Sequence, residues 1–556
     1  GASRGGHFGG VGSVGSFGLV HSDGEAIGMT KLSRQKYLPL ALFALALIVR
    51  LFFVFAYSFD GLYGQDAFAY FNQAVGIAEN IPRGHLPPLT FFWPNGYPFL
   101  AAMFMWGMGK TEIAALLPVL LTGAALAPLA YLLCLEFFGE YGPRAGWLAG
   151  LIFAVAGQPI QSSVTSMADV PGVFWAMLAV WCLVRAWKVP PIPTVPTNSH
   201  RSDNSHSSPN APELVGTHRN LQGNLSRLTL SGLFLAFATV TRWNYAMLAL
   251  SFAVYAVYQT RQHKTPRTWW MAPALVGFVV LLVQVWVSSH RPEGMFHQWL
   301  VGWHPRNFFG SSFQTPDGLQ TFERPVWLFN LLPGMHPAYL FPLFGVAIPL
   351  GAWHTWRERN WGAMILLWGW FMLNYAFLAG IPYENFRFGL ALYPPLVLFA
   401  SLGLALISTY ASRFTHPTSF KWVYWGLIGG GLLFMLFWAT RMVGSFLTTQ
   451  TATKQQALEI AAQLPPNATV ITLGPTLILD HYTPLKLVEY FTADETQFAQ
   501  LLRDTPSLYL LLNIPDIQGR YAGMEPAQNL QWLQTHATLT PLGEYPPYTL
   551  FALSEK

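Results

Sequence analysis

Long apolar runs separated by short polar stretches recur along most of this chain. A helix needs about 20 apolar residues to cross the hydrocarbon core of a bilayer. The pattern predicts about eleven spans, at Tyr37–Ser58, Ile113–Phe138, Ala145–Ala156, Val170–Trp187, Leu228–Val240, Tyr245–Tyr258, Trp269–Ser288, His336–Trp353, Trp361–Ala379, Phe388–Thr409 and Trp422–Val443. Tyr97–Met108 is apolar but shorter, so we expect it to lie at the interface without crossing. The fold class predicted is therefore a polytopic, mainly α membrane bundle.

The basic residues orient these spans. Lys31, Arg34 and Lys36 precede the first span, which places the N-terminus in the cytoplasm by the positive-inside rule. Five later basic loops then also fall inside. The segments 59–112, 157–169, 241–244, 289–335, 380–387 and everything after about 444 fall outside. We expect a multi-pass protein of a bacterial plasma membrane, with its polar outer segments and C-terminal domain beyond the cytoplasm.

Three stretches depart from the apolar pattern. Residues 1–30 are rich in Gly and Ser, and 189–227 are rich in Pro, Ser and Asn, so we expect a disordered N-terminal segment and a disordered cytoplasmic linker. After the transmembrane domain at 31–445, residues 446–556 alternate strand-like runs such as "SLYLLLNI" with amphipathic helices such as "TADETQFAQLLRD". This alternation predicts a small extracytoplasmic α/β domain. Its first strand has no glycine-rich phosphate loop, which argues against nucleotide binding there.

The composition agrees with a membrane protein. Of 556 residues, 52% are hydrophobic and 10% are charged, against about 25% charged in soluble domains. The net charge of +5 is spread between apolar runs, so a nucleic-acid partner is excluded. Cys134 and Cys182 both lie inside apolar runs and predict no disulfide framework.

The first outer segment carries the first candidate chemistry. Asp60 stands at the end of the first span, where we expect it to be solvated. Asp66 and Tyr70 share one face of a predicted interfacial helix, and His85 precedes the turn-rich "LPPLTFFWPNGYP". Taken alone, Asp66 is typical of a helix cap.

Further polar residues fall on the same predicted side. Asp169 stands before Pro171 at the mouth of a span, where it fits either an N-cap or a site carboxylate. Arg291 and Arg306 lie in the long outer loop, whose histidines have no recognised metal-ligand spacing. Glu384 and Arg387 precede another span, and an arginine there fits an interfacial anchor or a ligand of an anionic head group.

These motifs resemble the membrane glycosyltransferases of the GT-C class, in particular protein O-mannosyltransferase-like and aminoarabinose-transferase-like members. The resemblance rests on "GQDAFAY", "PPLTFFWPNGYP", "SMADVP" and "RFGLALYPP", and covers about residues 30–445. It implies a dolichyl- or polyprenyl-phosphate sugar donor, with Asp66 as the catalytic carboxylate, Asp169 as a second acid and Arg387 near the lipid phosphate. Relatives carry an acidic residue where His85 stands, so a divalent metal cofactor is left open.

The hypothesis that follows is an inverting sugar transfer to an acceptor hydroxyl of a lipid, glycan or protein at the outer face of the membrane. Asp66 would act as general base. The assigned residues are catalytic Asp66 and Asp169, and substrate-binding Tyr70, His85, Arg291, Arg306, Glu384 and Arg387. No metal ligand is assigned. A transporter or flippase is the rival interpretation; the predicted spans contain no obvious buried charge and no internal repeat, which disfavours it. A non-catalytic membrane scaffold is a further interpretation, but it does not explain why Asp66, Asp169 and Arg387 are predicted to lie on the same side of the membrane.

Overall fold

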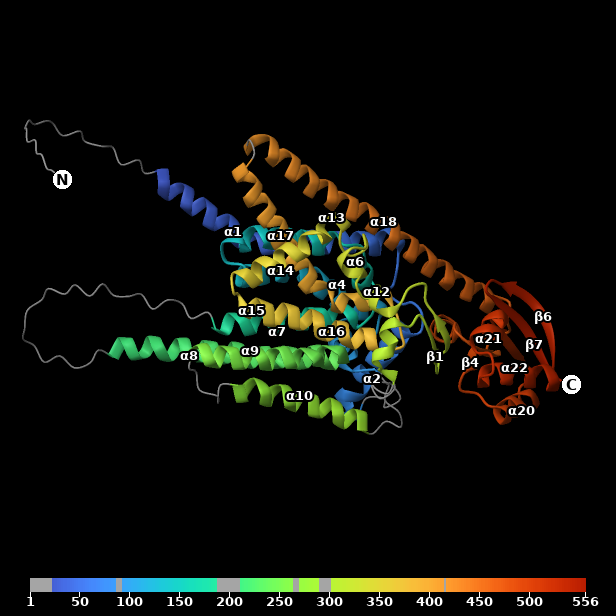
Figure 1. Ribbon diagram of the computed structural model, residues 1–556. Coiled ribbons are helices and arrows are strands. Elements are labelled where there is room, and N and C mark those ends of the chain that lie inside the picture. Colours follow the sequence, from blue (N-terminus) through green and yellow to red (C-terminus); the bar gives the residue numbers. More distant parts are fainter. Residues whose placement is uncertain (1–22, 87–92, 188–210, 264–269, 290–301, 415–416) are drawn as a thin grey trace, which may run out of the picture.

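The computed structural model describes residues 23–86, 93–187, 211–263, 270–289, 302–414 and 417–556, and over these it is mainly helical (Figure 1). Each predicted span coincides with one or more helices. The principal helices are α1 (Asp23–Tyr57), α4 (Glu112–Phe137), α5 (Gly142–Val155), α7 (Asp169–Trp187), α8 (Ala211–Thr241), α9 (Leu248–His263), α10 (Met271–Ser289), α14 (Ala347–Arg357), α16 (Gly369–Gly380), α17 (Tyr393–Phe414) and α18 (Pro417–Ala462).

Six helical segments of the described residues are long and apolar enough to cross a membrane. They are Tyr37–Tyr57, Glu112–Phe137, Asp169–Trp187, Trp361–Gly380, Tyr393–Tyr410 and Trp422–Ala462. Others of the predicted spans are shorter or broken; His336–Trp353, for example, is divided into α13 (Pro342–Gly345) and α14. Prolines and glycines in "FPLFGVAIPLG" account for this break.

Two stretches expected to be disordered are partly helical. Helix α1 begins at Asp23, so the end of the 1–30 segment belongs to it, and α8 begins at Ala211, within the 189–227 stretch. In both cases the helix of an apolar span continues into polar sequence, where composition alone predicted no structure. Residues 1–22 and 188–210 lie outside the described residues.

The first outer segment folds into short helices. They are α2 (Asp66–Asn80), η1 (Ile81–Arg83) and α3 (Gly96–Met108). Helix α3 corresponds to the stretch predicted not to cross, and its 13 residues are too few for a span. It packs against α2 and α4.

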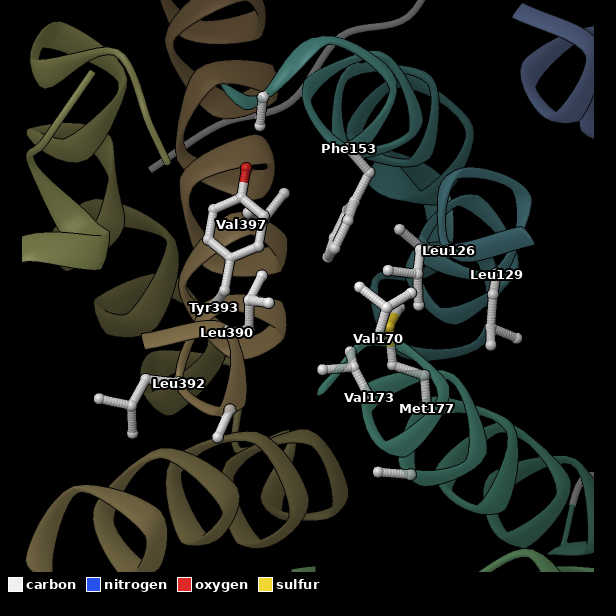
Figure 2. Close-up of a cluster of buried hydrophobic side chains, with 14 of the residues drawn as sticks. Leu126, Leu129, Phe153, Val170, Val173, Met177, Leu390, Leu392, Tyr393 and Val397 are labelled. Carbon is white, nitrogen blue, oxygen red and sulfur yellow. The ribbon is translucent and has the colours of Figure 1, made fainter. Parts of the chain in front are cut away.

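The core of the bundle lies next to the N-terminal ends of α7 and α17. Helix α4 packs against α1, α5 and α7. Figure 2 shows Val170, Val173 and Met177 of α7 beside leucines of α4, while Phe153 of α5 faces Tyr393 of α17. The centroids of these two rings are 4.9 Å apart. This close-packed apolar layer fixes the helix ends that carry the charged residues described below.

One buried charge contradicts the expectation of uncharged spans. Arg50 lies within α1 and is fully buried; its guanidinium donates to the carbonyls of Ala46, at 2.9 Å, and of Phe153, at 3.3 Å. Phe153 is in the last turn of α5, where a helix presents unpaired carbonyls and a partial negative charge. The prediction overlooked this arginine because the residues around it are strongly apolar.

The C-terminal domain is the predicted α/β layer. Its five-stranded sheet has the order β4-β3-β5-β7-β6. The parallel strands are β3 (Thr469–Thr472), β4 (Lys486–Glu489) and β5 (Leu508–Leu512), and the antiparallel ones are β6 (Ala537–Tyr545) and β7 (Tyr548–Glu555). Its helices are α19 (Thr476–Tyr482), α20 (Glu495–Asp504), α21 (Ile514–Arg520) and α22 (Glu525–His536). The 46-residue α18 joins this domain to the bundle, so the domain's own layer starts after Ala462 (Figure 1).

Candidate active site

Four charged residues from separate parts of the sequence meet at one end of the bundle. Asp66 is the first residue of α2, and Asp169 is the first residue of α7. Arg242 follows the end of α8, and Arg387 lies in η8 (Phe386–Ala391) just before α17. We call these four residues the charged cluster.

Arg387 is the centre of the charged cluster. Its Nη2 forms an ion pair with Asp66, and its Nε lies 4.0 Å from Oδ2 of Asp169. Its Nη1 donates to the hydroxyl of Tyr63 at 3.2 Å. The side chain of Arg387 is 14% exposed and that of Asp66 is 33% exposed, so Asp66 is the member open to solvent. One guanidinium thus connects the exposed carboxylate with the buried one.

Arg242 neutralises the buried carboxylate. It forms an ion pair with Asp169, and the two side chains are only 8% and 5% exposed. The ring of Phe388 lies beside both arginines, with its centroid 5.4 Å from the guanidinium carbon of Arg242 and 5.8 Å from that of Arg387. Asp169 therefore acts as the counter-ion of two arginines, and the cap that its sequence position suggested does not account for its contacts.

Burial and the neighbouring charges set the pKa values around the charged cluster. Burial lowers the pKa of Arg387, but Asp169, Tyr63 and Asp66 outweigh it and leave the pKa above its usual value. Burial raises the pKa of the Tyr63 hydroxyl. At neutral pH the Tyr63 hydroxyl therefore keeps its proton and Arg387 keeps its charge.

A small cavity lies beside Arg387 and Asp169. Oδ2 of Asp169 and Nε of Arg387 are both buried, and neither has a hydrogen-bond partner within the described part of the chain. They border a cavity of about 20 Å³ that Asn244, Tyr245 and Phe388 also line. A cavity needs roughly 10–15 Å³ to hold one water. The space between this acceptor and this donor therefore suits a single water molecule, which would accept from Nε and donate to Oδ2.

Of the residues predicted to form the site, Asp66, Asp169 and Arg387 come together. Tyr70 lies on the same helix as Asp66, and Glu384 precedes Arg387 by three residues in the sequence. Tyr70 is buried one turn after Asp66, with its ring centroid 5.4 Å from that of Tyr97. Glu384 is on the loop that leads to Arg387; its Oε1 is buried without a hydrogen-bond partner, and burial raises its pKa to about 7.

The other predicted site residues are not brought into the charged cluster. His85 and Arg306 are exposed, and neither side chain has a described contact with Asp66, Asp169 or Arg387. Arg291 lies outside the described residues. Their grouping with the site rested only on the predicted side of the membrane, which does not specify proximity.

Sequence reasoning missed Arg242 and Tyr63. Arg242 is a single arginine in the short outer turn "TRWN" between two apolar runs, and an unexplained charge at such a place is the signal that could have found it. Tyr63 lies three residues before Asp66 and had no such signal. Asp60 is also corrected: it is paired with Lys454 and Tyr482 of the C-terminal part, because the domain folds back onto the first outer segment.

Solved structures with the same architecture cover nearly all of this chain. ArnT from Cupriavidus metallidurans, bound to undecaprenyl phosphate, matches with a TM-score of 0.55 at 16% identity over 92% of this chain and 97% of that one. The archaeal oligosaccharyltransferase AglB from Archaeoglobus fulgidus, in complex with an inhibitory peptide and a dolichol-phosphate, matches with a TM-score of 0.56 at 12% identity over 94% and 74%. The chain has the GT-C fold.

The GT-C fold confirms the architecture that the motifs predicted. No protein-family model and no curated protein matches the sequence. At the identities above, the structural likeness establishes the fold, and the chemistry has to be argued from the charged cluster. The GT-C fold together with six helical segments able to cross a bilayer makes the chain a multi-pass integral membrane protein.

The charged cluster offers no obvious metal centre. Among the described residues, no group of three or more His, Cys, Asp or Glu side chains could hold a metal ion. Both carboxylates of the charged cluster already face guanidinium groups. A divalent cation here would have to compete with two fixed positive charges, so these residues do not fit a metal site.

Proposed function

We propose that this protein is a membrane glycosyltransferase that moves a sugar from a polyprenyl-phosphate donor to an acceptor hydroxyl at the outer face of the membrane. The observation that carries the proposal is the position of Arg387, which bridges the accessible carboxylate Asp66 and the buried carboxylate Asp169. Structures of the same fold bind undecaprenyl phosphate and a dolichol-phosphate, which supports a lipid-phosphate donor.

Arg387 is the proposed ligand of the donor phosphate. Guanidinium groups bind phosphate oxygens through parallel N–H donors. Among the described residues the Nε of Arg387 has no hydrogen-bond partner, and it borders the small cavity, so it retains an N–H donor for a phosphate oxygen. Asp169 lies beside this guanidinium, and Arg242 holds Asp169 in place through its ion pair. Stabilising the charge that develops on the leaving phosphate is expected to be the larger contribution to the rate.

Asp66 is the proposed general base. Its Oδ2 is occupied by Arg387 in the structure described here. A donor phosphate would draw the guanidinium toward itself and free this oxygen for the proton of the acceptor hydroxyl. The hydroxyl oxygen then forms the bond to the anomeric carbon as the bond to the phosphate oxygen breaks. This in-line displacement inverts the anomeric configuration, and the released product is the polyprenyl phosphate.

Other side chains would recognise the substrates. Glu384 offers a carboxyl oxygen with no partner, which suits a hydroxyl of the donor sugar. His85 and Arg306 are exposed, and we propose that they contact the acceptor. The acceptor class is a lipid, glycan or peptide carrying a hydroxyl. The outward orientation in a bacterial plasma membrane rests on the distribution of basic residues.

Turnover of polyprenyl-phosphate sugars by the purified protein tests the proposal. Asp66→Asn should lower kcat by about 10² to 10⁴-fold, because the amide cannot accept the proton. Arg387→Ala should raise KM for the donor and also lower kcat. The matched control is Asp504→Asn, which neutralises an exposed carboxylate of the C-terminal domain and should leave both constants unchanged. Full activity of the Asp66→Asn protein would remove Asp66 as the base.

A polytopic transporter or flippase is the second candidate, because Arg50 is a buried charge inside a span. Such residues often mark a substrate path. Here, however, the guanidinium is used by two backbone carbonyls of the bundle itself. Movement of a lipid-linked sugar across proteoliposomes without formation of a glycosylated product would favour transport over transfer.

A further inference from the structure

The C-terminal domain contacts the same short loop that leads into Asp66. The end of α18 and helix α19 reach this loop through Asp60. Oδ2 of Asp60 accepts from the Tyr482 hydroxyl at 2.6 Å and from Nζ of Lys454 at 2.7 Å. Its Oδ1 accepts from the backbone N–H of Leu62 at 3.1 Å. One carboxylate therefore ties the domain to the backbone of the loop.

A second contact lies on α2 itself. The ring centroid of His481 is 5.5 Å from that of Phe68 and 5.1 Å from that of Phe71, both on α2. Nε2 of His481 is 3.0 Å from Oε1 of Glu112 at the start of α4. In addition, Nε2 of Gln65 donates to the carbonyl of Gly474 at 3.3 Å. Helix α2 is thus held between the bundle and α19.

The same loop also contacts the charged cluster through Tyr63. The carbonyl of Gly61 accepts from the N–H of Ser166 at 2.8 Å. Gly61 has φ +92, and a Cβ there would lie 2.8 Å from Oγ of Ser166, so this close turn requires glycine. Two residues later, the hydroxyl of Tyr63 accepts from Arg387, and its ring packs on Phe446 with centroids 5.0 Å apart. Asp60 and Asp66 are therefore the two ends of one restrained segment.

We propose that the C-terminal domain and the end of α18 together position the catalytic segment, with Lys454 of α18 and Tyr482 and His481 of α19 as the positioning residues. They hold residues 59–66 so that Tyr63 and Asp66 meet Arg387. The catalytic part of this inference rests on the proposed function. The contacts are partly exposed, with Asp60 at 22% and Lys454 at 40%, so their loss should displace the segment without unfolding the protein.

Steady-state kinetics of Lys454→Met/Tyr482→Phe test the catalytic consequence. A misplacement of about 1 Å can cost roughly 10²-fold in rate, so we expect kcat to fall by about 10- to 100-fold while KM for the donor changes by less than about 2-fold. Two control variants remove the same chemical groups, a lysine ammonium and a tyrosine hydroxyl, at other positions. Lys110→Met breaks an ion pair with Glu79 in the same outer segment, and Tyr490→Phe removes a hydroxyl that bonds Pro526 within the domain. Both should keep the wild-type kcat, and Lys454→Arg with Tyr482 intact should retain most of it.

Hydrogen–deuterium exchange provides a readout that does not need activity. In the double variant, amides of residues 59–80 should exchange faster than in the wild type, whereas those of α4 and of the domain's sheet should not. The Lys110→Met and Tyr490→Phe proteins should show the wild-type pattern over 59–66. Unchanged exchange over 59–80, or an unchanged kcat in a preparation that Asp66→Asn inactivates, would overturn the inference and leave the proposed function standing. A wild-type protein without transfer activity would instead refute the proposed function, and the exchange data alone would then decide on the positioning contact.

Discussion

At the scale of single residues, the site is organised by how two arginines share two carboxylates. Arg242 serves only the buried Asp169, whereas Arg387 contacts Asp66 and lies close to Asp169. The close ion pair fixes Arg242 beside Asp169, whereas the Nε of Arg387 lies 4.0 Å from that carboxylate and is held less tightly by it. Arg242 can therefore be structural while Arg387 remains available to a ligand, and the two substitutions should have different consequences.

Arg242→Met should destabilise the protein strongly. Removing one partner of a buried ion pair leaves the other charge buried, which costs about 3–5 kcal/mol. Lys110→Met removes a partner from an ion pair whose side chains are 50% and 39% exposed, so it should cost only about 0–1 kcal/mol. Thermal unfolding in detergent measures both. Adding Asp169→Asn to Arg242→Met should recover part of the loss; a double variant as unstable as the sum of the single variants would contradict the coupling.

The sequence predicted that three of these residues share one site, but it did not predict the individual ion pairs or the part played by Arg242. Asp66, Asp169 and Arg387 were found because short polar motifs stand out beside apolar runs. The pairing of Arg387 with Asp66 joins positions 321 residues apart, which no local pattern encodes. Arg50 was overlooked for the opposite reason, since a single arginine changes the mean hydropathy of a long apolar run very little.

At the scale of elements, glycines decide how closely some helices approach. Helices α14 and α17 cross where Gly351 faces Phe399 and Gly403 faces Ala347. A Cβ on either glycine would collide with the backbone carbonyl of the facing residue. Small residues allow this approach between membrane helices. The hydropathy pattern located these helices, but it did not identify which of their glycines make contacts.

Gly351→Ala should destabilise the bundle, whereas Gly426→Ala should not. The first introduces a methyl group into a backbone contact and should cost about 1–3 kcal/mol. The second lies on an exposed face of α18 with no atom within 4 Å of the added Cβ, so the higher helix propensity of alanine should stabilise it by up to about 1 kcal/mol. Thermal unfolding of the two variants gives the comparison. Equal midpoints for both would show that α14 and α17 separate without cost.

At the scale of the whole molecule, helix α2 of the first outer segment and the C-terminal domain lie at one end of the bundle (Figure 1). The charged cluster lies at the same end, because Asp66 is the first residue of α2. The loop between α4 and α5, which contains η2 (Gly139–Tyr141), belongs to a side that the basic residues predict to be cytoplasmic. The fold could be predicted at this scale because each span can be recognised from the hydropathy of its own residues. The return of the C-terminal domain onto Asp60 could not, because it depends on the length and direction of α18.

Thiol labelling of intact cells tests this orientation directly. Both native cysteines are buried, so single cysteines introduced at exposed positions should report with a low background. A membrane-impermeant maleimide should label Gln497→Cys in the C-terminal domain without permeabilisation. It should label Glu140→Cys in η2 only after the membrane is opened, because this residue is exposed on the opposite side of the bundle. Labelling of Glu140→Cys alone in intact cells would place the charged cluster in the cytoplasm, and a donor presented at the outer face could then not reach Arg387.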